Sequence, residues 1–228
     1  MSVYIFRNKL NQEMRTFGSF TNNIVSEAKD TGIDVDVVFS PFKDDYLENF
    51  HSGNTYIIIS HGSYSGIYHK YDRSYIPQHQ VLVDINNLGR LQQTKIIAIS
   101  CGTAKILGPQ SVSQGGCESF LGFVNAIHFD KKDKQCDVCK YYTLYIRELY
   151  KRVFSKVLSK AVIEKWTFKK LARVLEWELK QEAVKSAENE KRKGKHAYFG
   201  RGIEQSIFAV TSSAASIKIF GNGNATIS

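Results

Sequence analysis

Two short strings place a histidine and a cysteine in the same local context. "TYIIISHG" (55–62) is an apolar run that ends in Ser-His-Gly, and "TKIIAISCG" (94–102) is an apolar run that ends in Ser-Cys-Gly. The thiolate is the reactive form of cysteine, and a nearby imidazole can take up the thiol proton. His61 and Cys101 are therefore candidates for the base and the nucleophile of a covalent catalyst. Either residue alone is more often a core residue, so the shared context carries this interpretation.

Each of the two residues is followed by a glycine. Gly62 and Gly102 leave room for the backbone of a substrate and expose main-chain N–H groups. Such groups can bind the negative charge that develops on a carbonyl oxygen under nucleophilic attack.

Buried strands are expected to hold both residues. The continuous apolar runs at 55–60, 94–100 and 120–127 are typical of strands covered on both faces. Helix-length segments separate them, which predicts an α/β fold with a mainly parallel central sheet and helices on both faces. Parallel neighbours would bring His61 and Cys101 to the same edge of that sheet, where ligands bind in such folds.

The other predicted elements surround this centre. Strands are expected at 3–6 and 33–40 and a helix within 18–31; amphipathic helices are expected at about 142–162 and 166–184, with Phe168, Leu171, Val174, Leu175 and Leu179 on the apolar face of the second. Residues 185–195 are predicted to be a frayed helix end or an exposed loop. Two strand-like runs around a Ser/Ala turn are predicted in the last 24 residues. The tyrosine-rich stretch 62–80 reads as a hairpin or loop that packs at the sheet edge or forms a flap facing the substrate, with His69 and His79 on its surface.

Composition places the chain among soluble globular proteins. Of the 228 residues, 43% are hydrophobic and 23% are charged. No apolar run reaches the roughly 18 residues of a membrane span, and the start lacks the pattern of a secretory signal. We therefore expect a cytoplasmic protein with reduced cysteines, built as a single domain over 1–228 with a basic helical segment at about 141–195.

The positive charge of the chain is concentrated in one region. Residues 131–201 hold 20 Lys/Arg and 9 Asp/Glu, whereas the formal net charge of the whole chain is +9. Such a region can bind nucleic acid or an acidic partner. Because no RNA-binding motif accompanies it, we favour a solvated helix face over a nucleic-acid surface.

The two strings and their surroundings resemble the caspase-like cysteine peptidases, the superfamily of caspases, gingipains and separase, and most closely its CHAT domain. The first similar feature is the strand ending in His-Gly. The second is the segment "LVDINNLGRLQQTKIIAISCGTA" (82–104), in which a short helix precedes the cysteine strand. The third is the segment "GGCESFLGFVNAIHFD" (115–130), which we interpret as a helix that carries Cys117 and leads into the next strand. The helix "LYIRELYKRVFSKVLSKAV" and the closing "ASIKIFGNGNATI" continue the likeness. The resemblance implies a caspase-like three-layer sandwich.

The resemblance also implies a function. His61 would be the general acid/base, Cys101 would attack the scissile carbonyl, and the backbone N–H groups of Gly62 and Cys101 would form the oxyanion hole. Asp84 and Asp130 are candidate acids for a pocket that holds a basic P1 side chain. The expected activity is a thiol protease without a cofactor that cleaves a protein partner in bacterial immunity, antiviral defence or programmed cell death, for example a gasdermin-like pore-former.

The expected partners are a protein substrate and either a regulatory protein or a second copy of the chain, with no membrane span. Two alternatives stay open, a catalytically silent interaction module with the same fold and a nucleic-acid-binding protein that uses the basic helices.

One further cysteine pair, "CDVC" (136–139), could suggest a metal site. A structural zinc site needs about four ligands, and His128 is the nearest candidate for a third. We read Cys136 and Cys139 as two ordinary thiols in a loop and expect no metal.

Overall fold

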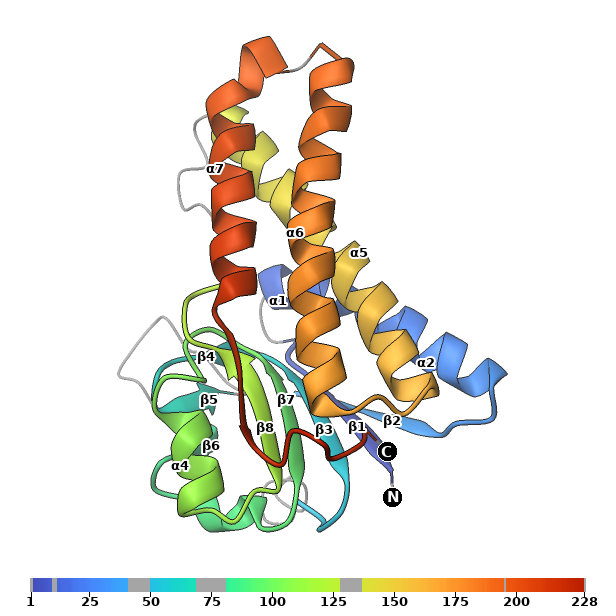
Figure 1. Ribbon diagram of the computed structural model, residues 1–228, viewed down its shortest axis with the longest axis vertical. Helices are drawn as coiled ribbons and strands as arrows, with labels where there is room; N and C mark the ends of the chain where they lie inside the picture. Colours follow the sequence, from blue (N-terminus) through green and yellow to red (C-terminus); the bar gives the residue numbers. More distant parts are fainter. Residues whose placement is uncertain are drawn as a thin grey trace.

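The centre of the protein is a six-stranded, mostly parallel sheet. The computed structural model describes residues 2–9, 12–40, 50–68, 81–127, 137–194 and 196–227. The strand order is β2-β1-β3-β7-β8-β9, and only β9 runs antiparallel to its neighbour (Figure 1). These strands are β1 Val3–Arg7, β2 Val35–Phe39, β3 Thr55–Ile59, β7 Lys95–Ile99, β8 Ser119–Phe123 and β9 Ile217–Gly221.

A smaller antiparallel sheet follows β3 directly. Its strands, in the order β4-β5-β6, are β4 His61–Gly62, β5 Gly66–Tyr68 and β6 Val81–Asp84. The helices are α1 Gln12–Phe17, α2 Thr21–Asp30, α4 Leu107–Ser113, α5 Asp137–Ile163, α6 Phe168–Arg192 and α7 His196–Ala215, with 3-10 turns η1 Gly18–Phe20 and η2 Leu88–Leu91. Of the described helices, none is long and apolar enough to cross a membrane.

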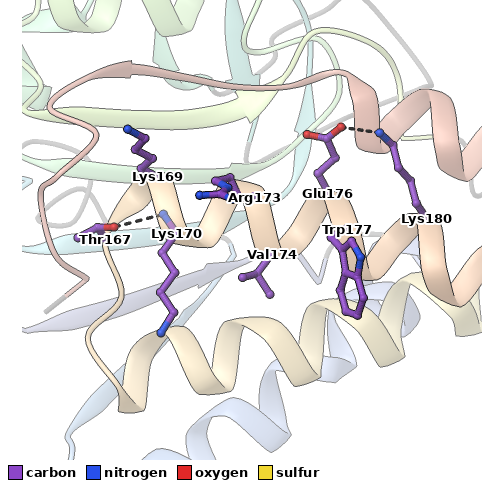
Figure 2. A pocket seen from close by; sticks show the side chains of 8 residues that line it. All are labelled: Thr167, Lys169, Lys170, Arg173, Val174, Glu176, Trp177 and Lys180. Carbon is purple, nitrogen blue, oxygen red and sulfur yellow. Dashed lines mark hydrogen bonds and ion pairs between the residues drawn. The ribbon is translucent and has the colours of Figure 1, made fainter.

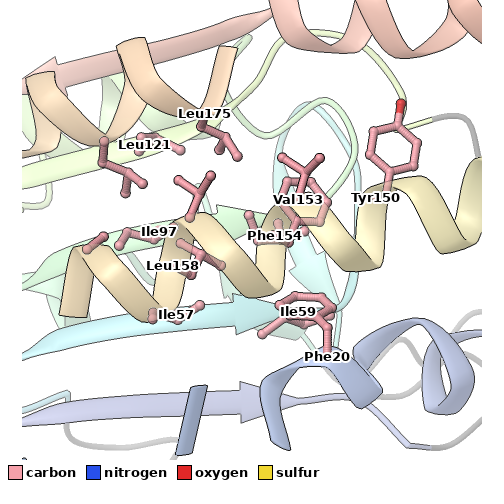
Figure 3. Close-up of a cluster of buried hydrophobic side chains, with 14 of the residues drawn as sticks. Phe20, Ile57, Ile59, Ile97, Leu121, Tyr150, Val153, Phe154, Leu158 and Leu175 are labelled. Carbon is pink, nitrogen blue, oxygen red and sulfur yellow. The ribbon is translucent and has the colours of Figure 1, made fainter. Parts of the chain in front are cut away.

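Both faces of the central sheet are covered. Alternate residues of a strand point to opposite faces, so Ile57 and Ile59 join a core with α1, α2, α5, α6 and α7, whereas Ile58 joins a second core with β5, β6, η2 and α4. Figure 3 shows the first core, where Phe154 and Leu158 of α5 lie over Ile57 and Ile59. Burial on both sides explains why β3 and β7 are apolar at nearly every position.

The strand order contains a switch point between β1 and β3. After β1 the chain moves outward to β2, and after β2 it returns to the other side of β1 and continues through β3, β7 and β8. Right-handed crossovers then put α2 on one face and α4 on the other, as the two cores show. The crevice beside such a switch point, at the carboxyl ends of the strands, is where α/β proteins bind ligands.

The structure confirms most predicted elements and corrects several others. The predicted strands correspond to β1, β2, β3, β7, β8 and β9, and the predicted helices to α2, α5 and α6. The strand expected at the start of the tail is wrong, because "QSIFAVTSSAA" lies within α7. The frayed end or loop expected at 185–195 is also wrong, because α6 continues to Arg192. Cys117 lies outside any helix, beyond the end of α4 at Ser113.

Candidate active site

The pairing of β3 with β7 brings His61 and Cys101 to the same edge of the sheet. The two strands are parallel, and their register sets Ile59 opposite Ile99. His61 and Cys101 each lie two residues beyond the last paired residues of this ladder, at the same edge of the sheet. Cys101 packs against the first core. The sequence prediction of two adjacent strands ending at one edge is therefore confirmed.

The serine before each residue fixes the two strand ends to each other. The Ser100 hydroxyl donates a hydrogen bond to the Ser60 carbonyl oxygen at 2.8 Å. The Ser60 hydroxyl in turn donates to the carbonyl oxygen of Tyr68 on β5 and accepts from the Asn8 side-chain amide at 3.0 Å. All three polar side chains are buried. This network holds the residue before His61 and the residue before Cys101 in fixed positions across β1, β3, β5 and β7.

The two glycines allow the loops after these strands to touch. A Cβ atom on Gly62 would lie 2.8 Å from the Cys101 carbonyl oxygen and 2.9 Å from Thr103 Cγ2. Gly102 has φ +72°, and a Cβ atom there would lie 2.8 Å from Tyr64 Cδ1. The main chain beside His61 therefore packs directly on the main chain of Cys101, which gives the glycines a packing role that the sequence did not indicate.

The Cys101 thiol is half-buried and makes a specific hydrogen bond. Its Sγ accepts the backbone N–H of Ile127 at 3.3 Å, from the turn that follows β8. Burial raises the pKa of the Cys101 thiol; the Ile127 N–H opposes this increase, and the charge of Glu13 on α1 adds to it. The shift favours the protonated thiol, so a nucleophilic role for Cys101 would need a group that takes up the proton.

The other described cysteine near a strand belongs to the core. Cys117 is buried in the second core, and its thiol donates to the carbonyl oxygens of Thr94 at 3.2 Å and Ser119 at 3.3 Å. Burial raises its pKa to about 12. The prediction of a core role for Cys117 is confirmed, although its position in a helix is not.

The candidate pocket acids are only partly described. Asp84 ends β6, and its carboxylate accepts hydrogen bonds from the backbone and side-chain N–H groups of Asn86 at 2.9 and 3.3 Å. These contacts give Asp84 a role in the turn after β6. Asp130 lies outside the described residues, so the pocket stays a prediction.

The remaining histidines and cysteines of interest add little to the site. His69, His79, His128 and Cys136 also lie outside the described residues. The backbone of Cys139 lies within α5, so the loop predicted for this cysteine is wrong. In the described part of the chain, no group of three or more His, Cys, Asp or Glu side chains could hold a metal ion.

Cations of the basic helical segment tie the helices together. Arg152 of α5 pairs with Glu182 of α6 at 2.9 Å, and Lys156 pairs with Glu178 at 2.7 Å. This part of the segment is thus a cross-linked, solvated helix face.

Sequence reasoning missed the residues that position the pair. Asn8 and Ile127 come from the ends of β1 and β8, far from His61 and Cys101 in the chain. The only signal in the sequence was the serine in front of each of the two residues.

Comparisons with protein-family models, with curated proteins and with solved structures found no match for this chain.

Proposed function

We propose that this protein is a cysteine endopeptidase that uses His61 and Cys101 as a catalytic dyad. The observation that carries the proposal is the parallel pairing of β3 and β7, because His61 and Cys101 follow the carboxyl ends of these two adjacent strands. The packing of Gly62 against Cys101 and the hydrogen bond between Ser100 and Ser60 give the pair a fixed frame. Catalytic pairs need such a frame, because misplacement by about 1 Å can cost roughly a hundredfold in rate.

The proposed reaction has two steps. His61 takes the proton of the Cys101 thiol while Sγ attacks the scissile carbonyl carbon, and the carbonyl oxygen becomes an oxyanion. The backbone N–H groups of Gly62 and Cys101 would donate to this oxyanion. The C–N bond then breaks, and the leaving amine takes the proton from His61. A water molecule, deprotonated by His61, hydrolyses the thioester and releases the acid and the free thiol.

The environment of Cys101 favours a mechanism in which His61 takes up the thiol proton during the attack. It disfavours a mechanism in which the thiolate and the imidazolium exist as an ion pair before the substrate binds. Burial raises the pKa of the thiol, which disfavours a resting thiolate. The Ile127 N–H partly offsets this effect, and it can stabilise the sulfur as negative charge develops on it. The thiol is thus protected from unspecific reaction until a substrate brings a carbonyl carbon to the site.

We also propose that the sheet belongs to a caspase-like three-layer sandwich. The arrangement that supports this is a mostly parallel sheet in which the histidine strand leads directly into a small antiparallel sheet, while the cysteine ends the neighbouring strand. The resemblance of the His-Gly and Ser-Cys-Gly strings points the same way. The proposed substrate is a protein, with a basic P1 side chain held by Asp84 or Asp130.

A peptide-library digest tests the proposed activity. Wild type should cleave a proteome-derived peptide library at a common P1 residue, and Cys101→Ala should abolish cleavage. His61→Ala should lower the rate by about a hundredfold or more, the usual contribution of a positioned acid/base. Cys117→Ala is the matched control and should keep the activity, because that thiol is buried in the core. Full activity in Cys101→Ala would remove the assignment.

A further inference from the structure

The outer face of α6 carries two rows of side chains with different chemistry. One row, at four- and three-residue spacing, consists of Lys169, Arg173, Glu176 and Lys180; the other consists of Lys170, Val174 and Trp177. In Figure 2 the first row lies along the upper edge of the helix and the second along the lower edge, on the side of α5. Together with Thr167 they line a shallow hollow of about 680 Å³.

The second row, called the apolar row because of Val174 and Trp177, lies beside the buried face of α6 and is partly exposed. Leu171, Leu175 and Leu179 supply that buried face in the first core. Val174, which was predicted to share this face, is half-buried: it packs against the first core and also lines the hollow. The Trp177 side chain is 58% exposed, and Val184, seven residues further along, is 50% exposed. Tryptophan is a residue type enriched in the energetic centres of protein interfaces.

The charges around Trp177 favour an acidic occupant. The lining holds four cations and one carboxylate. Lys180 pairs with Glu176 at 2.5 Å, and Lys170 pairs with Glu164 at 3.5 Å. The side chains of Lys169 and Arg173 make no ion pair with any described carboxylate, so their charges are available to a ligand. A second copy of this face would bring cations against cations, which is unfavourable.

The same residues fit a protein better than a nucleic acid or a membrane. Binding of a single strand needs several aromatic platforms along a basic groove, whereas Trp177 is the only exposed aromatic side chain among the described residues of α6. On the side of α5, Lys156 and Arg152 are already paired with Glu178 and Glu182 of α6, so they do not extend the basic surface that a polyanion or an anionic lipid surface would need. An amphipathic segment can instead place an apolar side chain on Trp177 and a carboxylate on Arg173.

We propose that the outer face of α6, from Lys169 to Val184, is a docking site for an acidic protein segment with an apolar anchor. The hollow begins where Thr167 pairs with Thr226, and the Thr226 carbonyl oxygen accepts a hydrogen bond from Lys95 at the start of β7. Cys101 follows the other end of β7. The docking site therefore begins at the sheet edge opposite the candidate active site, and it does not rest on the peptidase assignment.

Selection from random peptides tests the composition of the ligand. A displayed library of 16-residue peptides is selected on the wild-type protein, with counter-selection on Trp177→Ala. The enriched peptides should carry net negative charge and at least one aromatic or large aliphatic residue. A failure to enrich any sequence, or enrichment of neutral or basic peptides, would overturn the proposal.

Fluorescence anisotropy of one enriched peptide then tests the location. Trp177→Ala and Arg173→Glu should each weaken binding by about tenfold or more, and raising the salt concentration should weaken wild-type binding more than Arg173→Glu binding. Phe208→Ala and Lys29→Glu are matched controls from α7 and α2; Phe208 is 76% exposed, and both variants should bind like wild type. Equal binding by wild type, Trp177→Ala and Arg173→Glu would contradict the location, and so would an equal loss in the controls.

The same assay separates the competing ligands. A labelled 20-nucleotide DNA, an RNA of the same sequence and vesicles of phosphatidylcholine with phosphatidylserine are titrated at the same salt concentration. The proposal predicts that none of them competes with the peptide. Tighter binding of a nucleic acid or of the vesicles, lost in Trp177→Ala, would assign the surface to that ligand and overturn the proposal.

Discussion

At the scale of single residues, the titration of Cys101 decides how the proposed nucleophile is activated. Burial raises its thiol pKa, so the rate of alkylation by iodoacetamide should rise with pH with a midpoint above that of a cysteine in a short peptide. Mass mapping of the modified peptides follows each cysteine separately. Cys117, whose pKa is raised to about 12, should stay unmodified in the folded protein throughout the normal range. A midpoint for Cys101 near neutral pH would instead show a thiolate stabilised at rest.

The contact between Gly62 and Cys101 gives a second prediction for single residues. Gly62→Ala places a Cβ atom 2.8 Å from a backbone oxygen, so one of the two loops must shift. We expect a loss of about 1–3 kcal/mol in the free energy of unfolding, measured by urea denaturation. Gly89→Ala is the matched control, because its added Cβ would meet only open space beyond its chain neighbours, and it should change stability by no more than about 0.5 kcal/mol. Equal stability of Gly62→Ala and wild type would show that the two loops are not held together as described.

At the scale of elements, one face of α6 packs in the core and another face is exposed, so substitutions on the two faces should differ in their effect on stability. Leu171 is fully buried beneath the helix, so Leu171→Asp would place an unpaired charge in the core and should cost several kcal/mol. Val184 lies on the same helix and is 50% exposed, so the Val184→Asp variant should have nearly the same urea midpoint of unfolding as wild type. Similar midpoints for the two variants would mean that the face assigned to the core is exposed.

The elements also show what sequence patterns can and cannot predict. The strands β3 and β7 were predictable because both of their faces are buried, which leaves an unbroken apolar run. The tail was misread because "SIFAVTSS" has the composition of a strand and a turn. In α7 two of its hydroxyls are satisfied within the helix, where Ser206 donates to the Gly202 carbonyl oxygen at 2.6 Å and Thr211 to that of Ile207 at 2.8 Å. Packing of Val210 and Ala214 in the first core then outweighs local preference.

At the scale of the whole molecule, the order of the strands in the sheet is the feature that is hardest to predict from a single sequence. The side-by-side placement of β3 and β7 was predictable, because consecutive buried strands of an α/β fold usually lie next to each other. The hydrogen bonds from Asn8 and Ile127 were not, because they depend on β1 and β8 flanking β3 and β7 in the sheet. The face of α6 was missed for a related reason, since periodicity alone does not show which apolar residues a neighbouring helix covers.

Covalent labelling of the intact protein tests the proposed dyad most directly. Peptidyl acyloxymethyl ketones with basic, acidic and apolar P1 residues react with a cysteine only when the site positions the ketone. After incubation at neutral pH, mass mapping should find one adduct per chain, at Cys101, with the highest rate for a basic P1 residue. His61→Ala should slow the labelling by about a hundredfold, and urea-unfolded protein should lose the preference for Cys101. Failure to label Cys101, or equal labelling of Cys136 and Cys139, would contradict the proposed dyad.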